Sequence, residues 1–420
     1  MDGRLPVVTD VPPDRSRWRL TVHRRDFGPL AYAGDTGITE LADARSRRLE
    51  TALNTPAKLT FTIDGRSAGA AYVKELTTEV AAWRWDPELG RDRLMFRGVV
   101  AQSEDVLSEN GAHAVNFTCH DWLAVLHRRY LTNATDWTQT QRDQDDWVGD
   151  LLARAQDPYS SAGTSFAPGS HLPLALELVN PDGTVRSTKS GRLRDRTYQG
   201  QKSIGDAVAE MAACIDGFDF DVRPAADSDG TDYLRVFYGS QGTSRRDVVL
   251  AYGSSVSALT RTANSTDYSN YWRVIGNAGG TEGAPQVWAE RANADANDVG
   301  RIPVGLWMGA ANESDVSVAA TLQEKADGDL EESGILVPSY SLTLRPGFYR
   351  PGFPAMGDTL GLVVRSGRLD VSSTVRVQAL RFVIGDDGQE DVELDVGRPR
   401  LTLSALFRQT KRDIDALARR

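Results

Sequence analysis

The sequence predicts a mainly β protein with an α+β insert and a C-terminal helix. Segments in which apolar and polar residues alternate fill the first third of the chain and return after residue 249, as half-buried strands require. Between them, apolar residues recur at helical spacing, and one such segment runs directly into an alternating strand. The predicted parts are residues 1–130, 131–248, 249–400 and a helical tail at 401–420.

The composition is that of a globular protein large enough for two or three domains. Of 420 residues, 40% are hydrophobic and 25% are charged, and 58 acidic against 48 basic residues give a net charge of −10. This charge argues against a clamp around duplex DNA, which needs a basic surface. The chain has no apolar run of membrane-spanning length and no signal-peptide core, so we expect no membrane anchor and folding in a cytoplasm. A disulfide between Cys119 and Cys214 is not expected there.

Residues 1–130 are expected to form a compact β domain closed by a short helix. Alternating segments begin at Trp18 and in PAKLTFTIDG, where Asp64–Gly65 makes a turn. The segments EVAAWRW and RLMFRGVVAQSEDVL flank a loop with a proline and a glycine, which predicts a hairpin. After the strand HAVNFTC, apolar residues up to Tyr130 recur at helical spacing, and Asp121 is the candidate N-cap.

Residues 131–248 are expected to form a small α+β unit. One helix is predicted in DQDDWVGDLLARAQDP, where Pro158 ends it. A second begins at the N-cap candidate Ser203 and ends at Gly217, and the strand FDFDV follows. The residues predicted to face the interior of these helices are Trp147, Val148, Leu151, Leu152, Ile204, Ala207, Val208, Met211, Ala212 and Ile215.

Strands are predicted to return in residues 249–400, interrupted by one helix. The inner side of this helix is expected to carry Val318, Leu322 and Leu330. The segments SYSLTLRPGFY, GDTLGLVVRSG, STVRVQALRFVIG and EDVELDVG predict a β meander, with DDGQ as the last turn. The tail LSALFRQTKRDIDALARR has helical potential.

The sequence predicts no catalytic residue, cofactor or metal. It has no phosphate-binding glycine loop, dinucleotide fingerprint, paired-histidine zinc helix or serine elbow. Cys119 beside His120 is a candidate nucleophile pair, but neighbours on a strand point to opposite faces. We therefore interpret Cys119 as buried, His120 as exposed and Asp121 as a helix cap. Asp227–Asp232 (DSDGTD) lacks the glycine and glutamate positions of a calcium loop and is predicted to be a turn.

Asp219 and Asp221 have the spacing of paired carboxylates on one face of a strand. The same alternation recurs in VELDV near the end of the chain, so we interpret both aspartates as facing water or a neighbouring subunit. Trp83 and Trp85 also share a strand face, with Arg84 opposite, and a place in the buried core is favoured over stacking on a sugar.

Two loops are the strongest candidates for a binding surface. NSTDYSNY and RPGFYRPGFP combine Tyr, Asn, Gly and Pro, and such loops carry contacts on β scaffolds. The C-terminal tail adds apolar residues. The candidate protein-contact residues are Tyr268, Tyr271, Trp272, Phe348, Tyr349, Leu406, Phe407, Ile414 and Leu417.

The order of parts resembles the baseplate hub, or tail-hub minor tail protein, of long-tailed bacteriophages, of the siphovirus type that infects actinobacteria. The resemblance lies in LETALNTPAKLTFTIDG with LMFRGVVAQSEDVL, in HDWLAVLHRRYL, in RTYQGQKSIGDAVAEMAACIDGFDFDVRP, and in GFPAMGDTLGLVVRSG through EDVELDVG. It covers most of the chain and concerns organisation more than single residues. No peptidase or muramidase extension follows.

The resemblance implies a structural virion protein of the tail tip, assembled in the host cytoplasm and not an enzyme. It implies a homotrimer in which two β-barrel-like hub domains per subunit form a pseudo-sixfold ring, with a small α+β domain and a C-terminal helix. The implied partners are the distal tail protein, the tape-measure protein and the tip or receptor-binding minor tail proteins. Viral DNA would pass through the lumen without sequence-specific binding, and an acidic lumen would suit this passage.

Two other functions stay open at the level of the sequence. One is a cell-wall-degrading enzyme of the tail tip that uses a carboxylate pair such as Asp219 and Asp221. The other is a glycan-binding module that uses aromatic residues such as Trp83 or Tyr268.

Overall fold

The computed structural model of the chain consists mainly of β-strands, which confirms the predicted fold class. It divides into two compact units, Met1–Leu259 with Ser341–Arg420, and Thr260–Tyr340. The four predicted parts do not coincide with these two units. The structure describes residues 18–24, 39–133, 135–156, 172–198, 200–214, 217–225, 231–263, 265–266, 268–276, 287–293, 305–313, 319–334, 338–350 and 352–397. The predicted tail helix at 401–420 lies outside them.

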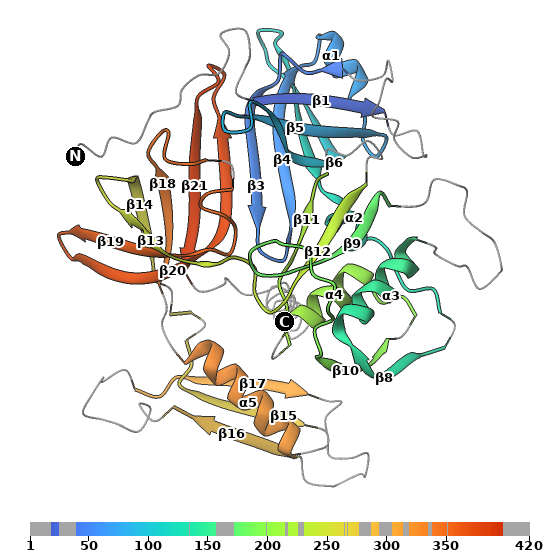
Figure 1. The fold of residues 1–420 in the computed structure, drawn as a ribbon, viewed down its shortest axis with the longest axis vertical. Helices are drawn as coiled ribbons and strands as arrows, with labels where there is room; N and C mark the ends of the chain where they lie inside the picture. The colour runs from blue at the N-terminus through green and yellow to red at the C-terminus, as the bar shows by residue number, and fades with distance from the viewer. Residues whose placement is uncertain are drawn as a thin grey trace. The chain divides into compact units, whose positions relative to one another are not determined.

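A 13-stranded sheet organises the larger unit (Figure 1). Its order is β14-β18-β21-β20-β3-β4-β7-β6-β5-β1-β2, and β13 and β19 extend it from β20. β3 (Arg45–Ala52) pairs antiparallel with β20 (Leu369–Ile384), so strands from both ends of the chain belong to one sheet. The other members are β1 (Trp18–Arg24), β2 (Thr39–Glu40), β4 (Thr55–Asp64), β5 (Thr78–Asp86), β6 (Arg91–Leu107), β7 (His113–His120), β13 (Ser244–Ala251), β14 (Val256–Thr262), β18 (Ser339–Leu344), β19 (Thr359–Ser366) and β21 (Glu390–Gly397).

The alternating patterns place the buried faces of these strands correctly. The predicted hairpins β5–β6 and β20–β21 are both antiparallel pairs. Inward residues predicted from alternation are buried: Trp18, Leu20, Val22, Leu59, Phe61, Ile63, Val392, Leu394 and Val396. A short helix, α1 (Ala68–Tyr72), follows β4 and is capped by Ser67.

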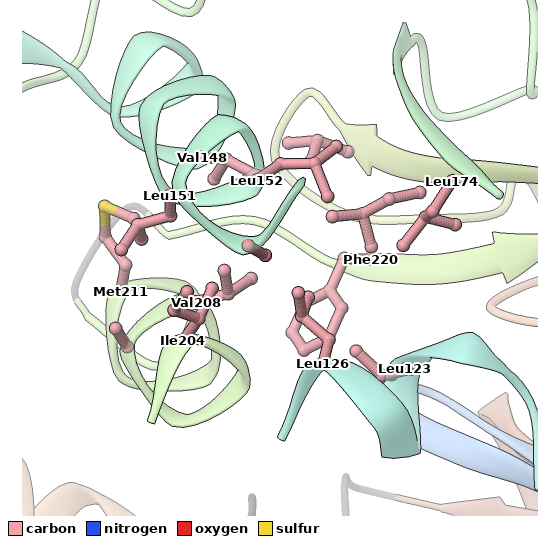
Figure 2. Packing of buried hydrophobic residues seen from close by; sticks show 14 of the residues in the cluster. Leu123, Leu126, Val148, Leu151, Leu152, Leu174, Ile204, Val208, Met211 and Phe220 are labelled. Atoms are coloured by element: carbon pink, nitrogen blue, oxygen red, sulfur yellow. The ribbon is translucent and has the colours of Figure 1, made fainter. Parts of the chain in front are cut away.

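The predicted α+β unit has its own hydrophobic core, shown in Figure 2. Helices α3 (Gln144–Gln156) and α4 (Ile204–Ala212) pack with α2 (Trp122–Leu126) against a three-stranded sheet. In that sheet β12 (Asp232–Phe237) lies between β9 (Leu174–Val179), to which it is parallel, and β11 (Phe220–Arg223). β8 (Trp137–Asp143) pairs with β10 (Leu193–Tyr198) beside it.

Both N-cap predictions in this region are confirmed. Ser203 Oγ accepts a hydrogen bond from the backbone N of Asp206, and Asp121 accepts one from Leu123. All the predicted inner residues of α3 are buried, and so are those of α4 up to Met211. Ala212 is half-buried, and Ile215 lies outside the described residues. One detail is wrong: α2 ends at Leu126, and Tyr130 beyond it is exposed.

The smaller unit is a three-stranded sheet with one helix. β15 (Tyr271–Gly276) lies between antiparallel β16 (Trp288–Ala292) and parallel β17 (Met308–Glu313). Helix α5 (Ala319–Ser333) packs on one face through Leu322 and Ala326. Leu322 is buried as predicted and Leu330 is half-buried, whereas Val318 falls outside the described residues. Among the described helices, none is long and apolar enough to cross a membrane.

Candidate functional site: buried polar junctions

Asp219 lies where three distant segments of the larger unit meet. Its carboxylate accepts hydrogen bonds from Asn54 Nδ2 at 3.0 Å, from the backbone N of Gln241 at 2.8 Å and from Arg376 Nη2 at 2.5 Å. Asn54 is in the turn between β3 and β4, and Arg376 is on β20. Asp219 is only 8% exposed. The interpretation that it faces water or another subunit is therefore wrong: three donors satisfy the charge inside the chain.

Asn54 fixes the geometry of this junction. Its φ of 56° lies in the left-handed region, which asparagine tolerates better than most residues. Its Oδ1 accepts the backbone N–H of Phe220 at 2.8 Å while its Nδ2 donates to Asp219. One side chain thus ties the β3–β4 turn to the start of β11 through both of its amide atoms.

Asp221 has a different environment from Asp219. It forms a two-bond ion pair with Arg235 of the neighbouring strand β12, at 2.7 and 2.6 Å, and the side chains of both residues are about one-fifth exposed. Gln241 Nε2 also donates to it at 2.8 Å. The two aspartates of FDFDV are each paired with a separate arginine, as a load-carrying contact requires and a free acid–base pair does not.

A second junction is fully buried and joins the large sheet to the α+β unit. Arg97 on β6 and Asp232 on β12 form a two-bond ion pair, and neither side chain is exposed. Trp122 Nε1 on α2 donates to Asp232 at 2.8 Å, and the backbone N of Ala225 donates at 2.9 Å. Of the predicted DSDGTD turn, Asp227 to Gly230 lie outside the described residues, while Asp232 is this buried partner.

A third junction links the N-terminal and C-terminal strands of the sheet. Arg84 on β5 donates to Glu390 on β21 at 2.9 and 2.5 Å, and Trp18 Nε1 on β1 donates to the same carboxylate at 2.7 Å. The expected orientation of β5 is therefore reversed. Arg84 is 3% exposed, whereas Trp83 and Trp85 are only half-buried, because Glu390 satisfies the arginine on the inner face.

The Cys119–His120 segment is placed as its structural interpretation requires, except that His120 is half-buried instead of exposed. Burial raises the pKa of the Cys119 thiol, which makes it a poor nucleophile. Burial also raises the pKa of Asp121 to about 7, although backbone N–H donors of Ala57, Ala124 and Leu123 oppose that shift. In the described part of the chain, no group of three His, Cys, Asp or Glu side chains could hold a metal ion.

His23 on β1 gives the junction region a pH dependence. Burial, and next the nearby positive charge of Arg97, lower the pKa of His23 to about 4. Between pH 6.5 and 4 the folded chain then binds fewer protons than the unfolded chain, so stability falls as the pH falls. We expect His23→Gln to reduce the loss of unfolding free energy between pH 6.5 and 4.5 by roughly 1–2 kcal/mol. Urea unfolding at a series of pH values measures this, and parallel pH curves for both proteins would contradict it.

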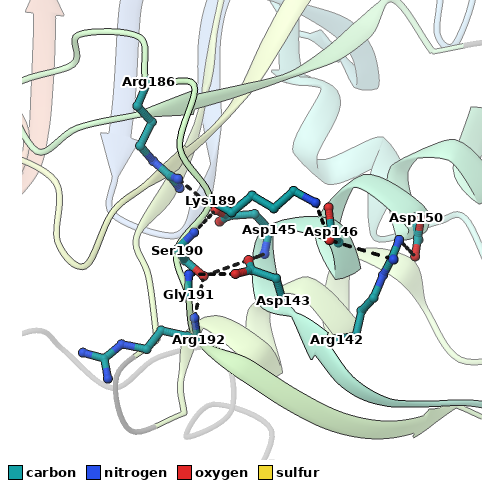
Figure 3. A network of polar contacts seen from close by, with 10 residues as sticks. All are labelled: Arg142, Asp143, Asp145, Asp146, Asp150, Arg186, Lys189, Ser190, Gly191 and Arg192. Atoms are coloured by element: carbon teal, nitrogen blue, oxygen red, sulfur yellow. Dashed lines mark hydrogen bonds and ion pairs between the residues drawn. The ribbon is translucent and has the colours of Figure 1, made fainter.

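A network of acidic residues holds the segment 186–192 against the start of α3 (Figure 3). Asp143 accepts from Ser190 Oγ at 2.8 Å and from the backbone N of Gly191 at 2.7 Å. Asp145 accepts from the backbone N of Ser190 at 2.8 Å and pairs with Arg186 at 2.9 Å. Gly191 has a φ of 69°, a conformation that favours glycine. This turn-rich stretch is therefore anchored through its backbone.

The predicted contact loops are only partly exposed. Tyr268, Tyr271 and Phe348 are half-buried, and their contact role stays a prediction. Trp272 and Tyr349 are each 7% exposed, and the structure does not place them on a loop surface. Trp272 Nε1 donates to Ser333 Oγ at 2.5 Å, and the Tyr349 ring packs 5.1 Å from that of Phe382. The tail residues Leu406, Phe407, Ile414 and Leu417 lie outside the described part.

No protein-family model matches the sequence, and no curated protein matches it. Three solved structures of tail proteins, two of them from prophages, match over nearly their whole length. They are the tail protein from Neisseria meningitidis MC58 (10% identity, TM-score 0.52, 91% of this chain and 96% of that chain), the 43 kDa tail protein of prophage MuSo2 from Shewanella oneidensis (10%, 0.54, 90% and 98%) and the prophage tail protein gp18 from Listeria monocytogenes EGD-e (9%, 0.50, 94% and 99%).

The chain has a phage tail-protein fold. At about 10% identity the likeness concerns the path of the backbone and not individual side chains. The three junctions explain physically how the tail-protein fold is held in this chain, because each joins segments more than 100 residues apart.

Proposed function

We propose that the chain is a structural component of the phage tail tip. The observation that carries this proposal is the fold likeness to tail proteins, which extends over 90% or more of this chain and nearly all of theirs. The junctions support it, because buried ion pairs between distant strands suit a protein that must keep its shape under load.

In finer terms, we propose a trimeric baseplate hub in the virion. It would join the distal tail ring and the tape-measure protein to the tip or receptor-binding proteins and form part of the DNA exit channel. The unbroken sheet from β14 to β2 supports this role, since it makes the two β regions of one subunit a single hydrogen-bonded body. Such a subunit can transmit a displacement from one end to the other.

We further propose that the chain acts without catalysis. The carboxylates that a cell-wall hydrolase would need, Asp219 and Asp221, are each held by an arginine, Arg376 and Arg235. The alternative glycan-binding role is weakened for Trp83, which is half-buried and donates to Thr21 Oγ1 at 2.9 Å.

Mass photometry of the purified chain tests the hub, followed by negative-stain imaging of each species. We expect a species of three times the 45.9 kDa chain mass that appears as a ring with a central hole. A chain that remains monomeric, also when mixed with purified tail tubes, would contradict the hub. If that monomer cleaved purified cell walls, the hydrolase would replace it.

A further inference from the structure

A groove of about 540 Å³ opens in the α+β unit between β8, the second half of α3 and the segment after α2. None of the junctions described above uses it. The side chains that matter for its chemistry are Tyr130, Trp137, Gln139, Arg142, Asp150 and Arg154.

The groove carries one positive charge that the chain itself does not neutralise. Arg142 donates to Asp150 at 2.9 Å and lies 3.9 Å from Asp146, so its charge is balanced. Arg154 is exposed, and in the described part of the chain it forms no ion pair. A free guanidinium in a chain with a net charge of −10 is a selective feature, because most of the surrounding surface repels the anions that this site attracts.

Arg154 is held in position by an aromatic ring. Its guanidinium lies 4.0 Å from the centre of the Trp137 ring, in cation–π geometry. Trp137 in turn contacts Trp147 edge-on at 4.8 Å and Tyr198 at 6.2 Å. A stacked guanidinium loses little side-chain freedom on binding and keeps its N–H edge open for a carboxylate.

The same stacking makes a sugar a poor occupant. Sugars bind to tryptophan through the ring face, and here Arg154 covers a face of Trp137. Two polar atoms of the groove lack partners within the chain: Gln139 Oε1 and Arg142 Nε are buried and form no hydrogen bond. One is an acceptor and the other a donor, as the N–H and C=O groups of a peptide backbone require.

We propose that this groove binds an extended, carboxylate-bearing peptide segment of a partner protein. An aspartate or glutamate side chain of that segment accepts two hydrogen bonds from Arg154, and its backbone pairs with Gln139 and Arg142. This binding site is independent of the hub proposal, since it needs only the α+β unit. A single guanidinium pair at a partly open site gives weak binding, with a Kd on the order of 100 μM.

The test uses the full-length chain and a fluorescein-labelled peptide of alternating aspartate and alanine, followed by fluorescence anisotropy at low ionic strength. The same peptide with asparagine in place of aspartate is the ligand control. Arg154→Gln is the test variant. Arg368→Gln is the matched control variant, because Arg368 is an exposed arginine in the turn between β19 and β20 and loses the same charge.

We expect the aspartate peptide to bind at least about tenfold more tightly than the asparagine peptide, and Arg154→Gln to abolish that difference while Arg368→Gln keeps it. Equal effects of the two variants, or no binding of the aspartate peptide, would overturn the proposal. Binding of an N-acetylglucosamine oligosaccharide that depends on Arg154, without peptide binding, would replace it with a glycan site. Self-association of the chain lost in Arg154→Gln would replace it with a contact between copies.

Discussion

Asp232→Ala is expected to lower the unfolding free energy by about 3–5 kcal/mol. The substitution leaves the Arg97 guanidinium buried without a counter-ion, and it removes the acceptor for Trp122 and for the backbone N of Ala225. Equilibrium unfolding in urea, followed by tryptophan fluorescence and by circular dichroism, measures the loss. Both probes should give the same midpoint shift if the junction couples the sheet to the α+β unit.

A double variant separates the cost of an unpaired charge from the cost of lost packing. We expect Arg97→Met with Asp232→Leu to be more stable than Asp232→Ala alone, because no buried charge remains unpaired. Asp370→Ala is the control on an exposed pair, since Asp370 and Arg365 are 85% and 80% exposed at the side chain, and it should leave the midpoint unchanged. A loss of less than about 1 kcal/mol in Asp232→Ala would mean that Arg97 finds water instead.

Asp219→Ala should cost about 2–3 kcal/mol, more than twice the effect of Asp221→Ala, which we expect to be about 1 kcal/mol or less. The two residues are two positions apart and each pairs with an arginine. They differ in burial, and Asp219 alone joins three segments of the chain. Urea unfolding of both variants under the same conditions makes the comparison direct.

The pair also has a clear contrary outcome. Equal destabilisation by the two alanine variants would show that Asn54, Gln241 and Arg376 rearrange to satisfy one another when the carboxylate is removed. Asp219→Asn gives a further check, because it keeps the side-chain shape but cannot neutralise Arg376, and it should fall closer to Asp219→Ala than to the native chain.

Most of the elements could be predicted from the sequence because local physics determines them. The alternation around Leu59 and Leu394 required one buried face, and the structure buries both residues. The caps Ser203 and Asp121 follow from backbone donors at a helix start, which only nearby side chains can satisfy.

The junctions could not be predicted, because their partners are remote. Alternation shows that Asp219 and Arg84 differ in polarity from their neighbours, but not what covers the polar side. Arg376 lies 157 positions from Asp219, and Glu390 lies 306 positions from Arg84. A charged residue on a strand points outward by default, and only a remote opposite charge reverses this.

The groove could not be predicted for a related reason. Trp137 and Arg154 come from a strand and a helix, and neither segment alone indicates that the two side chains stack. Aromatic loops drew the prediction toward Trp272 and Tyr349 instead. Both belong to packed clusters, because a large ring buries more apolar area inside a fold than at its surface.

The pairing of β3 with β20 has a consequence for synthesis on the ribosome. Thr51 of β3 emerges 329 positions before Leu380, to which its hydroxyl donates in the finished chain. Until then, that side of β3 is an open edge that can recruit a strand from another nascent chain. Phage tail genes are translated into many copies at once, so protection of this edge sets a rate limit on the yield of soluble subunits. A chain truncated before β20 should aggregate even though the local hairpin β5–β6 can still form.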